Sequence, residues 1–391
     1  DNRLALGLEY SARFICGDSV YAYGVPSQRE RFKYRAGFEH CIDHFTAKGV
    51  NMPYLKELCS RTNMNNPANA LWKLTAFREE FRQKPSELVD IQESNIAYHA
   101  GATLEQAQPV GHSVIEVNNR EDLQAVLNTN AGSGKTLFLR AGEYRLKQSL
   151  TIPSDIHICG EGRSTVLICE PTIRTAAILL GDLDAKNITI ENLVVDGSKE
   201  HQEAYDPNSG RFYRTGRYSN ALAGISMRGE AGHAFSNIKL KNLTVINFSR
   251  SGVYISDAEG IEIDHCDFTE NGAHVVPGPR LQHNLMIQHS SNIMIKDSRF
   301  DTSIRGCGLV LDHCKSLKVE NCEIARNGWH GLLMAECHNG KIENCLVEGN
   351  DGCGFMGEYL HDGSNLIQIR HNKIQYNNEY GICLLYTSDA A

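Results

Sequence analysis

The sequence predicts an all-β fold of stacked coils, a parallel β-helix with three strands in each coil. The first observation is a phrase of about 23 residues that recurs along the chain, a length typical of solenoid repeats. The second is that each copy consists of short runs in which apolar and polar residues alternate. Alternation with a period of two indicates β-strands, and runs this short are not helices. Three such runs per repeat fit one coil whose backbone bonds to the coils on either side.

The most regular copies of the phrase begin with cysteine and reach asparagine five residues later. They are CDFTENG, CEIARNG and CLVEGND, which start at Cys266, Cys322 and Cys345. Each follows an alternating run and precedes a glycine that opens another apolar run, such as GLVL at Gly308. The polar residues expected at the preceding turn are Asn192, Asn242, His265, Asp297, Asn321, Asn344 and His371. We expect turn asparagines of neighbouring coils to bond to one another as a ladder, with His265 and His371 in structural positions there.

The residues upstream of the repeat fit the same architecture. EDLQAVLN (121–128) predicts a short helix, and the segment 137–167 contains alternating runs separated by Gly-rich turns. Together with the repeats, this region resembles the right-handed parallel β-helix of the pectate-lyase-like superfamily from about Val114 to Leu385. That superfamily contains lyases, hydrolases, epimerases and non-enzymes. The resemblance therefore implies the fold and leaves the chemistry open.

The two ends of the chain have a different character. Residues 1–95 show helical spacing of large apolar residues, which predicts a small α-helical domain of unknown role. Residues 96–113 are expected to be a linker, and the β-helix is expected to span 114–385. The last predicted strand stops in the middle of a coil. We therefore interpret the β-helix as truncated there and residues 386–391 as a non-native tail.

Composition excludes some classes of function. The formal net charge is −8 and no block of basic residues occurs, which argues against nucleic-acid binding. No apolar run approaches the roughly 18 residues that a membrane span requires. Many of the 13 cysteines sit at repeat positions, so we expect mostly free, buried thiols that pack as small apolar groups. The resemblance implies a secreted or periplasmic carbohydrate-active protein of bacterial type.

Strand alternation identifies a candidate site on the face that follows each GLVL-type glycine. Outward positions and flanking turns on neighbouring coils are expected to bring together the catalytic candidates Arg305, Asp312, His313, His330 and Glu358. The same face and two long insertions, 198–220 and 273–283, supply the predicted substrate-binding residues Arg228, Tyr254, His283, Gln288, Tyr213 and Arg280. The expected partner is a polysaccharide or oligosaccharide, and the oligomeric state stays open.

Three functions fit these residues. A lyase acting on a uronic acid needs a cation and a base, which Arg305 and either His330 or His313 could supply. Calcium held by Asp312 and Glu358 could replace the arginine. In an inverting hydrolase the same two carboxylates, about 9.6 Å apart across two coils, would be acid and base, with Glu336 as an alternative. Non-catalytic carbohydrate binding or adhesion is the third. The docking of a loop or partner is favoured by the outward apolar residues Met286, Val310, Leu333 and Met356.

Overall fold

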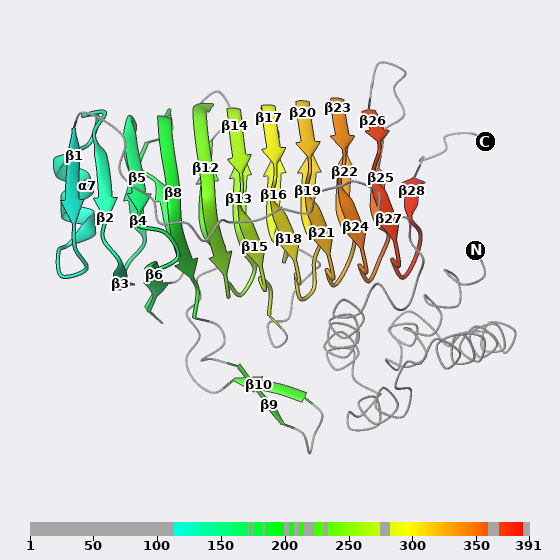
Figure 1. The fold of residues 1–391 in the computed structure, drawn as a ribbon, viewed down its shortest axis with the longest axis horizontal. Helices are drawn as coiled ribbons and strands as arrows, with labels where there is room; N and C mark the ends of the chain where they lie inside the picture. Colours follow the sequence, from blue (N-terminus) through cyan, green and yellow to red (C-terminus); the bar gives the residue numbers. More distant parts are fainter. Residues whose placement is uncertain are drawn as a thin grey trace, which may run out of the picture.

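The computed structural model is a parallel β-helix in which successive coils stack along one axis (Figure 1). It describes residues 113–170, 172–173, 175–182, 184–198, 203–206, 211–214, 223–229, 234–273, 282–358 and 367–385. The predicted helical domain, the linker up to residue 112 and the predicted tail lie outside the described residues. Within the described part of the chain, no helix is long and apolar enough to cross a membrane.

Two sheets form the walls of the coils, and all pairings within them are parallel. Sheet A has 17 strands: β1 (Val114–Val117), β2 (Thr136–Leu139), β3 (Gly142–Leu146), β5 (Ile156–Gly160), β6 (Thr165–Cys169), β8 (Lys186–Asp196), β12 (Phe235–Ile246), β14 (Ala258–Asp264), β15 (Asp267–Thr269), β17 (Ser291–Lys296), β18 (Arg299–Asp301), β20 (Lys315–Glu320), β21 (Glu323–Ala325), β23 (His338–Glu343), β24 (Leu346–Glu348), β26 (Ile367–Arg370) and β27 (Lys373–Gln375). Sheet B has nine strands: β4 (Leu150–Ile152), β7 (Ala176–Leu180), β11 (Ala223–Arg228), β13 (Ser251–Ser256), β16 (Leu285–Gln288), β19 (Leu309–Asp312), β22 (Leu332–Ala335), β25 (Phe355–Glu358) and β28 (Ile382–Leu385).

Each regular coil contributes one strand to sheet B and two to sheet A, as in the run β16, β17, β18. The prediction of three strands per coil is confirmed. The antiparallel pair β9 (Glu203–Asp206) and β10 (Arg211–Arg214) projects from the stack (Figure 1). The predicted short helix is also present as α7 (Leu123–Thr129), and its N-cap Asp122 accepts hydrogen bonds from the backbone N–H groups of residues 124 and 125.

A single column of apolar side chains fills the coils. Alternate strand residues point inward, as shown by Leu309 and Leu311 of β19, which are both fully buried. Cysteines occupy the same column at the predicted repeat positions, including Cys266, Cys322 and Cys345. All ten cysteines in the described part of the chain are free thiols and nine are buried, as expected from the sequence.

The turns between the two strands of sheet A are made by single residues in the left-handed conformation. All seven predicted turn residues have positive φ, between 48° and 58°. Asparagine, aspartate and histidine tolerate this region better than most residues, which explains why the repeat keeps them at this position. The expected ladder forms at two steps, where Asn242 donates to Asn192 over 2.8 Å and Asn321 donates to Asp297 over 3.2 Å. His265 instead contacts its neighbour Asp264.

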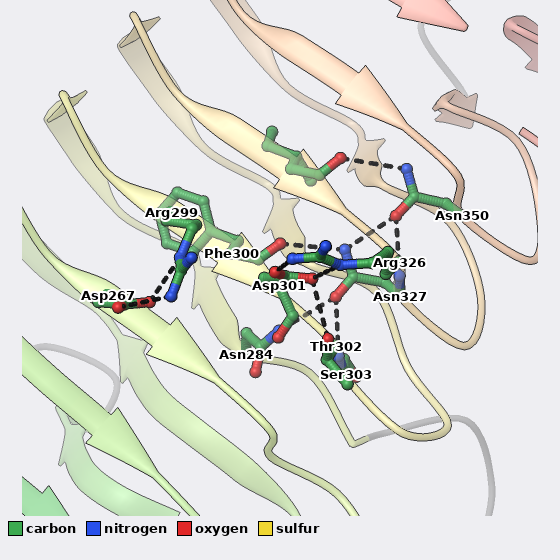
Figure 2. A network of polar contacts seen from close by, with 11 residues as sticks. Asp267, Asn284, Arg299, Phe300, Asp301, Thr302, Ser303, Arg326, Asn327 and Asn350 are labelled. Carbon is green, nitrogen blue, oxygen red and sulfur yellow. Dashed lines mark hydrogen bonds and ion pairs between the residues drawn. The ribbon is translucent and has the colours of Figure 1, made fainter. Parts of the chain in front are cut away.

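A second and more continuous ladder lies inside the coils, and the sequence interpretation did not predict it. Its asparagines are fully or almost fully buried, and each donates to the next at 2.8–3.0 Å. The ladder consists of Asn271, Asn284, Asn327, Asn350 and Asn377 (three of them in Figure 2). A Cβ at Gly308 would lie 2.6 Å from the Nδ2 of Asn327. The conserved glycine of the phrase therefore leaves room for the ladder.

Candidate functional site

The outer face of sheet B carries two rows of aligned side chains. The strand register places Tyr254, Met286 and Val310 in one row, continued by Leu333 and Met356. The second row, two residues further along each strand, runs Arg228, Ser256, Gln288, Asp312, Ala335 and Glu358. Outward placement of these positions was expected from the period of two. Residues far apart in the chain thus become neighbours at a coil spacing of about 4.8 Å.

Polar contacts connect the two rows across four coils. The guanidinium of Arg228 lies over the ring of Tyr254, 4.5 Å from its centroid. The Tyr254 hydroxyl donates to Gln288 Oε1 at 2.7 Å, and Gln288 Nε2 donates to Asp312 Oδ2 at 2.6 Å. Arg228 is exposed and the other three side chains are half-buried. We call this connected set, together with His313 and Glu336, the polar track.

His313 ends the polar track at the corner after β19. It is a left-handed residue, with φ of 52°, and its exposed ring lies between two carboxylates. Nδ1 contacts Asp312 Oδ1 at 2.7 Å, and Nε2 contacts Glu336 Oε2 at 3.0 Å. The ring also stacks on His289 of the preceding coil, with centroids 4.9 Å apart. A histidine held by two acceptors is oriented for proton exchange and stays open to solvent.

Glu358 occupies the same row as Asp312, with Ala335 between them. The two carboxylates therefore stand about 9.6 Å apart by coil spacing. Because Ala335 has only a methyl side chain, it leaves a low point in the row between two longer acidic residues. Asp312, His313 and Glu358 therefore lie at the same end of the sheet B strands, within three consecutive coils.

The other two catalytic candidates lie at the opposite end of the strands. His330 precedes β22 by two residues. It is five residues before Ala335, which is the register neighbour of Asp312. Five residues of extended strand place His330 roughly 16 Å from Ala335. Arg305 is exposed in the segment before β19, seven residues from Asp312. The expected convergence of all five catalytic candidates is therefore not seen. They share adjacent coils but form two separate groups.

The environment of His330 does not suit a general base. Its side chain is almost fully buried, and Nδ1 accepts a hydrogen bond from the backbone N–H of Cys353 at 2.9 Å. In the neutral ring the proton must then sit on Nε2, so neither nitrogen has a free lone pair. His283, a predicted substrate-binding residue, repeats this arrangement two coils away, where its Nδ1 accepts from Cys307 N–H at 3.0 Å. Burial, followed by the charge of His330, lowers the pKa of His283 to about 4.

The outward apolar residues form a second hydrophobic cluster, separate from the column inside the coils. Val310, Leu333 and Met356 are at most 9% exposed although they point away from the interior. Cys307 and Cys353 belong to the same cluster, and Met286 and Trp329 pack against it. This apolar strip separates the polar track from His283 and His330. It explains why the two ends of the sheet B strands offer different environments.

Calcium binding by Asp312 and Glu358 is not supported by this arrangement. Both oxygens of Asp312 already accept hydrogen bonds, and Ala335 separates the two side chains. Among the described residues, three clusters bring at least three potential metal ligands within 4.8 Å of one another, and neither carboxylate belongs to one of them. Of the remaining predicted substrate-binding residues, Arg280 lies outside the described residues. Tyr213 lies on β10, where the backbone alone is described.

Two arginine–aspartate pairs on sheet A were not anticipated. Arg299 binds Asp267 through two hydrogen bonds of 3.0 and 2.9 Å, and Arg326 binds Asp301 in the same bidentate manner (Figure 2). The side chains of Arg326 and Asp301 are 5% and 3% exposed. Asp267 and Arg299 are register neighbours on adjacent coils, and Arg326 directly follows Ala325, the register neighbour of Asp301. Aligning the repeats by coil would have revealed this pairing, whereas local sequence spacing does not.

Comparison with solved structures identifies similar solenoids at low sequence identity. The A-module of the mannuronan C-5 epimerase AlgE6 from Azotobacter vinelandii is 15% identical, with a TM-score of 0.39 over 67% of this chain and 74% of that chain. The family 28 exopolygalacturonase of Yersinia enterocolitica is 11% identical, with a TM-score of 0.39 over 71% and 66%. The Streptococcus pneumoniae surface protein and adhesin PfbA is 9% identical, with a TM-score of 0.39 over 73% and 98%. These similarities identify no activity.

No curated protein sequence matches the chain significantly. The family model described as the right handed beta helix region matches residues 177–357 and 223–391, which together make up more than half of the chain. This agrees with the parallel three-strand coils and with the resemblance drawn from the repeats. The chain belongs to the right-handed β-helix family.

Proposed function

We propose that the chain is a carbohydrate-active protein that binds a polysaccharide along the outer face of sheet B and cleaves it hydrolytically. The observation that carries the proposal is the pair of carboxylates on either side of Ala335. Asp312 and Glu358 belong to one outward row and are about 9.6 Å apart, near the upper end of the separation used by inverting glycoside hydrolases. The low point at Ala335 gives a sugar ring and a water molecule a place between them.

The roles follow from the contacts of each carboxylate. Asp312 accepts a hydrogen bond from Gln288 Nε2 and contacts His313 Nδ1, so its neighbours orient the carboxylate beside Ala335. It is therefore assigned as the base that activates water. Glu358 is assigned as the acid that protonates the leaving oxygen. The exposed guanidinium of Arg228 suits a uronate carboxylate bound further along the polar track.

A uronate lyase is the second candidate, favoured by the His313–Asp312 contact of 2.7 Å. In that reaction the Nε2 of His313, released from Glu336, would remove the C5 proton of the sugar while a cation neutralises the substrate carboxylate. The C4–O bond then breaks to leave a C4–C5 double bond, and the leaving oxygen takes up a proton. Arg305, the cation expected from the sequence, lies at the other end of the strands, and Glu336 brings a further negative charge to His313. This placement favours hydrolysis over elimination. A secreted or periplasmic location accompanies either candidate.

A polysaccharide panel that includes polyuronides and neutral glycans tests the proposal. Hydrolysis releases reducing ends without the ultraviolet absorbance of a C4–C5 double bond, and elimination produces both. We expect Asp312→Asn and Glu358→Gln to lose about 10²–10⁴-fold in rate. Glu343→Gln on sheet A is the matched control and is expected to retain activity. Double-bond absorbance from the wild-type protein, together with loss of activity in His313→Gln, would support the lyase instead. Binding of a glycan without any product would support an adhesion role and refute both enzymatic candidates.

A further inference from the structure

A cluster of histidine, cysteine and glutamate lies on sheet A, among the first coils of the stack. His157 and Cys159 are two residues apart on β5, so their side chains leave the same face of the strand. Glu191 of β8 is the register neighbour of Cys159 on the next coil. The imidazole nitrogen, the sulfur and a carboxylate oxygen lie within 4.8 Å of one another. Three chemically different metal ligands therefore meet at one point.

The contacts of His157 orient its ring toward this point. Nδ1 is 3.0 Å from the hydroxyl of Thr136, and Nε2 is 2.9 Å from Glu191 Oε1. A ligating histidine usually donates its other N–H to a nearby oxygen, and the Thr136 hydroxyl is placed to accept it. Nε2 and the Glu191 carboxylate then both face the position that a cation would occupy.

The sulfur of Cys159 is positioned in a similar way. The thiol is free, and Sγ accepts a hydrogen bond from Asn192 Nδ2 at 3.4 Å. Asn192 is itself held by Asn242, which donates to its Oδ1 at 2.8 Å, and by its left-handed turn conformation. Burial raises the pKa of the Cys159 thiol to about 11, and the hydrogen bond from Asn192 opposes that shift. A bound metal would therefore have to displace the thiol proton, because the thiolate is the form that binds metals.

The cluster is accessible to solvent on one side. The side chains of His157 and Glu191 are 29% and 23% exposed, whereas Cys159 is buried behind them. Ions can enter from the solvent side, and a water molecule can complete the coordination there. One nitrogen, one sulfur and one carboxylate ligand with an open fourth position is a donor set that suits tetrahedral Zn²⁺ better than Ca²⁺ or Mg²⁺.

We propose that His157, Cys159 and Glu191 form a binding site for one Zn²⁺ ion, oriented by Thr136 and Asn192, that links β5 to β8 across neighbouring coils. The site is independent of the polar track, which lies on sheet B. It also does not depend on the proposed hydrolase activity. In the bound form, the one proton of the neutral His157 ring would sit on Nδ1 and be donated to the Thr136 hydroxyl, Nε2 would bind the metal, and binding would release the proton of the thiol.

The other two ligand clusters are weaker candidates and serve as controls. In the group His330, Cys353 and Glu379, the Nδ1 of His330 is already used by the backbone N–H of Cys353. The third group, Asp264, His265 and Asp297, contains no sulfur. Only the first group combines a thiol with a histidine whose ring nitrogens make no backbone contact.

Metal titration of the full chain, stripped with a chelator under reducing conditions, tests the proposal. Calorimetry with Zn²⁺ is expected to show one site, and Co²⁺ is expected to give thiolate-to-cobalt charge-transfer absorption. Cys159→Ser should abolish that absorption, and Cys353→Ser should leave it unchanged. His157→Gln should also lose the Zn²⁺ site. Because His157 is more exposed than Cys159, this variant can still be tested if Cys159→Ser does not fold. Thr136→Val is expected to weaken Zn²⁺ binding by about 10–100-fold.

The reverse pattern would overturn the assignment. Charge-transfer absorption that survives Cys159→Ser and disappears in Cys353→Ser would move the site to the sheet B side. The absence of a thiolate band in the wild-type protein, or Zn²⁺ binding that is unchanged in His157→Gln, would show that the cluster is only an ion pair beside a buried thiol.

Discussion

Replacing Asn327 by alanine should destabilise the solenoid far more than replacing the turn asparagine six residues earlier. Asn327 is fully buried and makes four side-chain hydrogen bonds. Nδ2 donates to Phe300 O at 3.1 Å and to Asn350 Oδ1 at 2.9 Å. Oδ1 accepts from Ser303 N–H at 2.9 Å and from Asn284 Nδ2 at 3.0 Å. At about 1 kcal/mol for each bond, the loss is about 4 kcal/mol.

The matched control is Asn321→Ala. Asn321 is exposed, donates one hydrogen bond of 3.2 Å to Asp297 and has a φ of 54°. Replacement by alanine removes one solvent-accessible hydrogen bond, and alanine tolerates the left-handed region less well than asparagine. The free energy of unfolding should therefore fall by about 1–2 kcal/mol. Asn321→Gly should recover most of this loss, because glycine adopts positive φ freely. Asn327 does not have positive φ, so glycine there should be no better than alanine.

Urea unfolding followed by circular dichroism compares the two variants through their midpoints, provided that the slope is unchanged. Because coils interact mainly with their neighbours, amide exchange adds a local measurement. The amide of Ser303 loses its acceptor in Asn327→Ala and should exchange faster than amides several coils away. A loss of stability in Asn327→Ala no larger than that in Asn321→Ala would refute the reasoning that the interior ladder supports the fold.

Three further outcomes follow from the described contacts. The pKa of His283 is about 4 in the folded protein against an ordinary 6.5, so only the unfolded chain gains the proton between these values. The contribution of His283 to the free energy of unfolding should be constant above pH 6.5 and fall by about 3 kcal/mol as the pH drops to 4. His283→Gln should remove this part of the pH dependence in urea titrations at each pH. Arg326→Met should lower the free energy of unfolding by about 3–5 kcal/mol, because it leaves Asp301 buried without its partner. Adding Asp301→Asn should restore much of the thermal stability. A double variant as unstable as Arg326→Met would contradict this. Gly331→Ala should lower the melting temperature, because the added Cβ would lie 2.6 Å from the ladder atom Asn350 Nδ2. In the control Gly132→Ala, the added Cβ has no atom within 4 Å, so only the cost of the positive φ should be seen.

The sequence was sufficient for the architecture because both the repeat and the turn chemistry are local. Alternation identified the inward Leu309 and the outward Asp312. The polar turn residues, from Asn192 to His371, lie at corners as expected, and the structure adds that all of them are left-handed. The interior ladder was missed because an asparagine surrounded by apolar residues looks the same in sequence whether it faces solvent or its counterpart on the next coil. The recurrence of Asn271, Asn327 and Asn350 at one phase was the available signal.

The candidate site was only partly predictable for a geometric reason. Adjacent coils are about 4.8 Å apart, but each residue along a strand adds about 3.3 Å. His330 and Asp312 lie on neighbouring coils and still occupy opposite ends of sheet B, because their positions along the strand differ by five residues. Asp312 and Glu358 lie two coils apart and are closer, because they share one row.

The stacking of equivalent coils also constrains how this protein can change over evolution. Deleting or duplicating one complete coil would shorten or lengthen the row from Arg228 to Glu358 by one position and leave every remaining side chain on its original face. Inserting a single residue within a strand such as β19 would instead turn its outward residues inward. Variation in length among relatives should therefore occur in whole coils or at the corners, and the length of sugar chain that the face accommodates would change in steps of one coil.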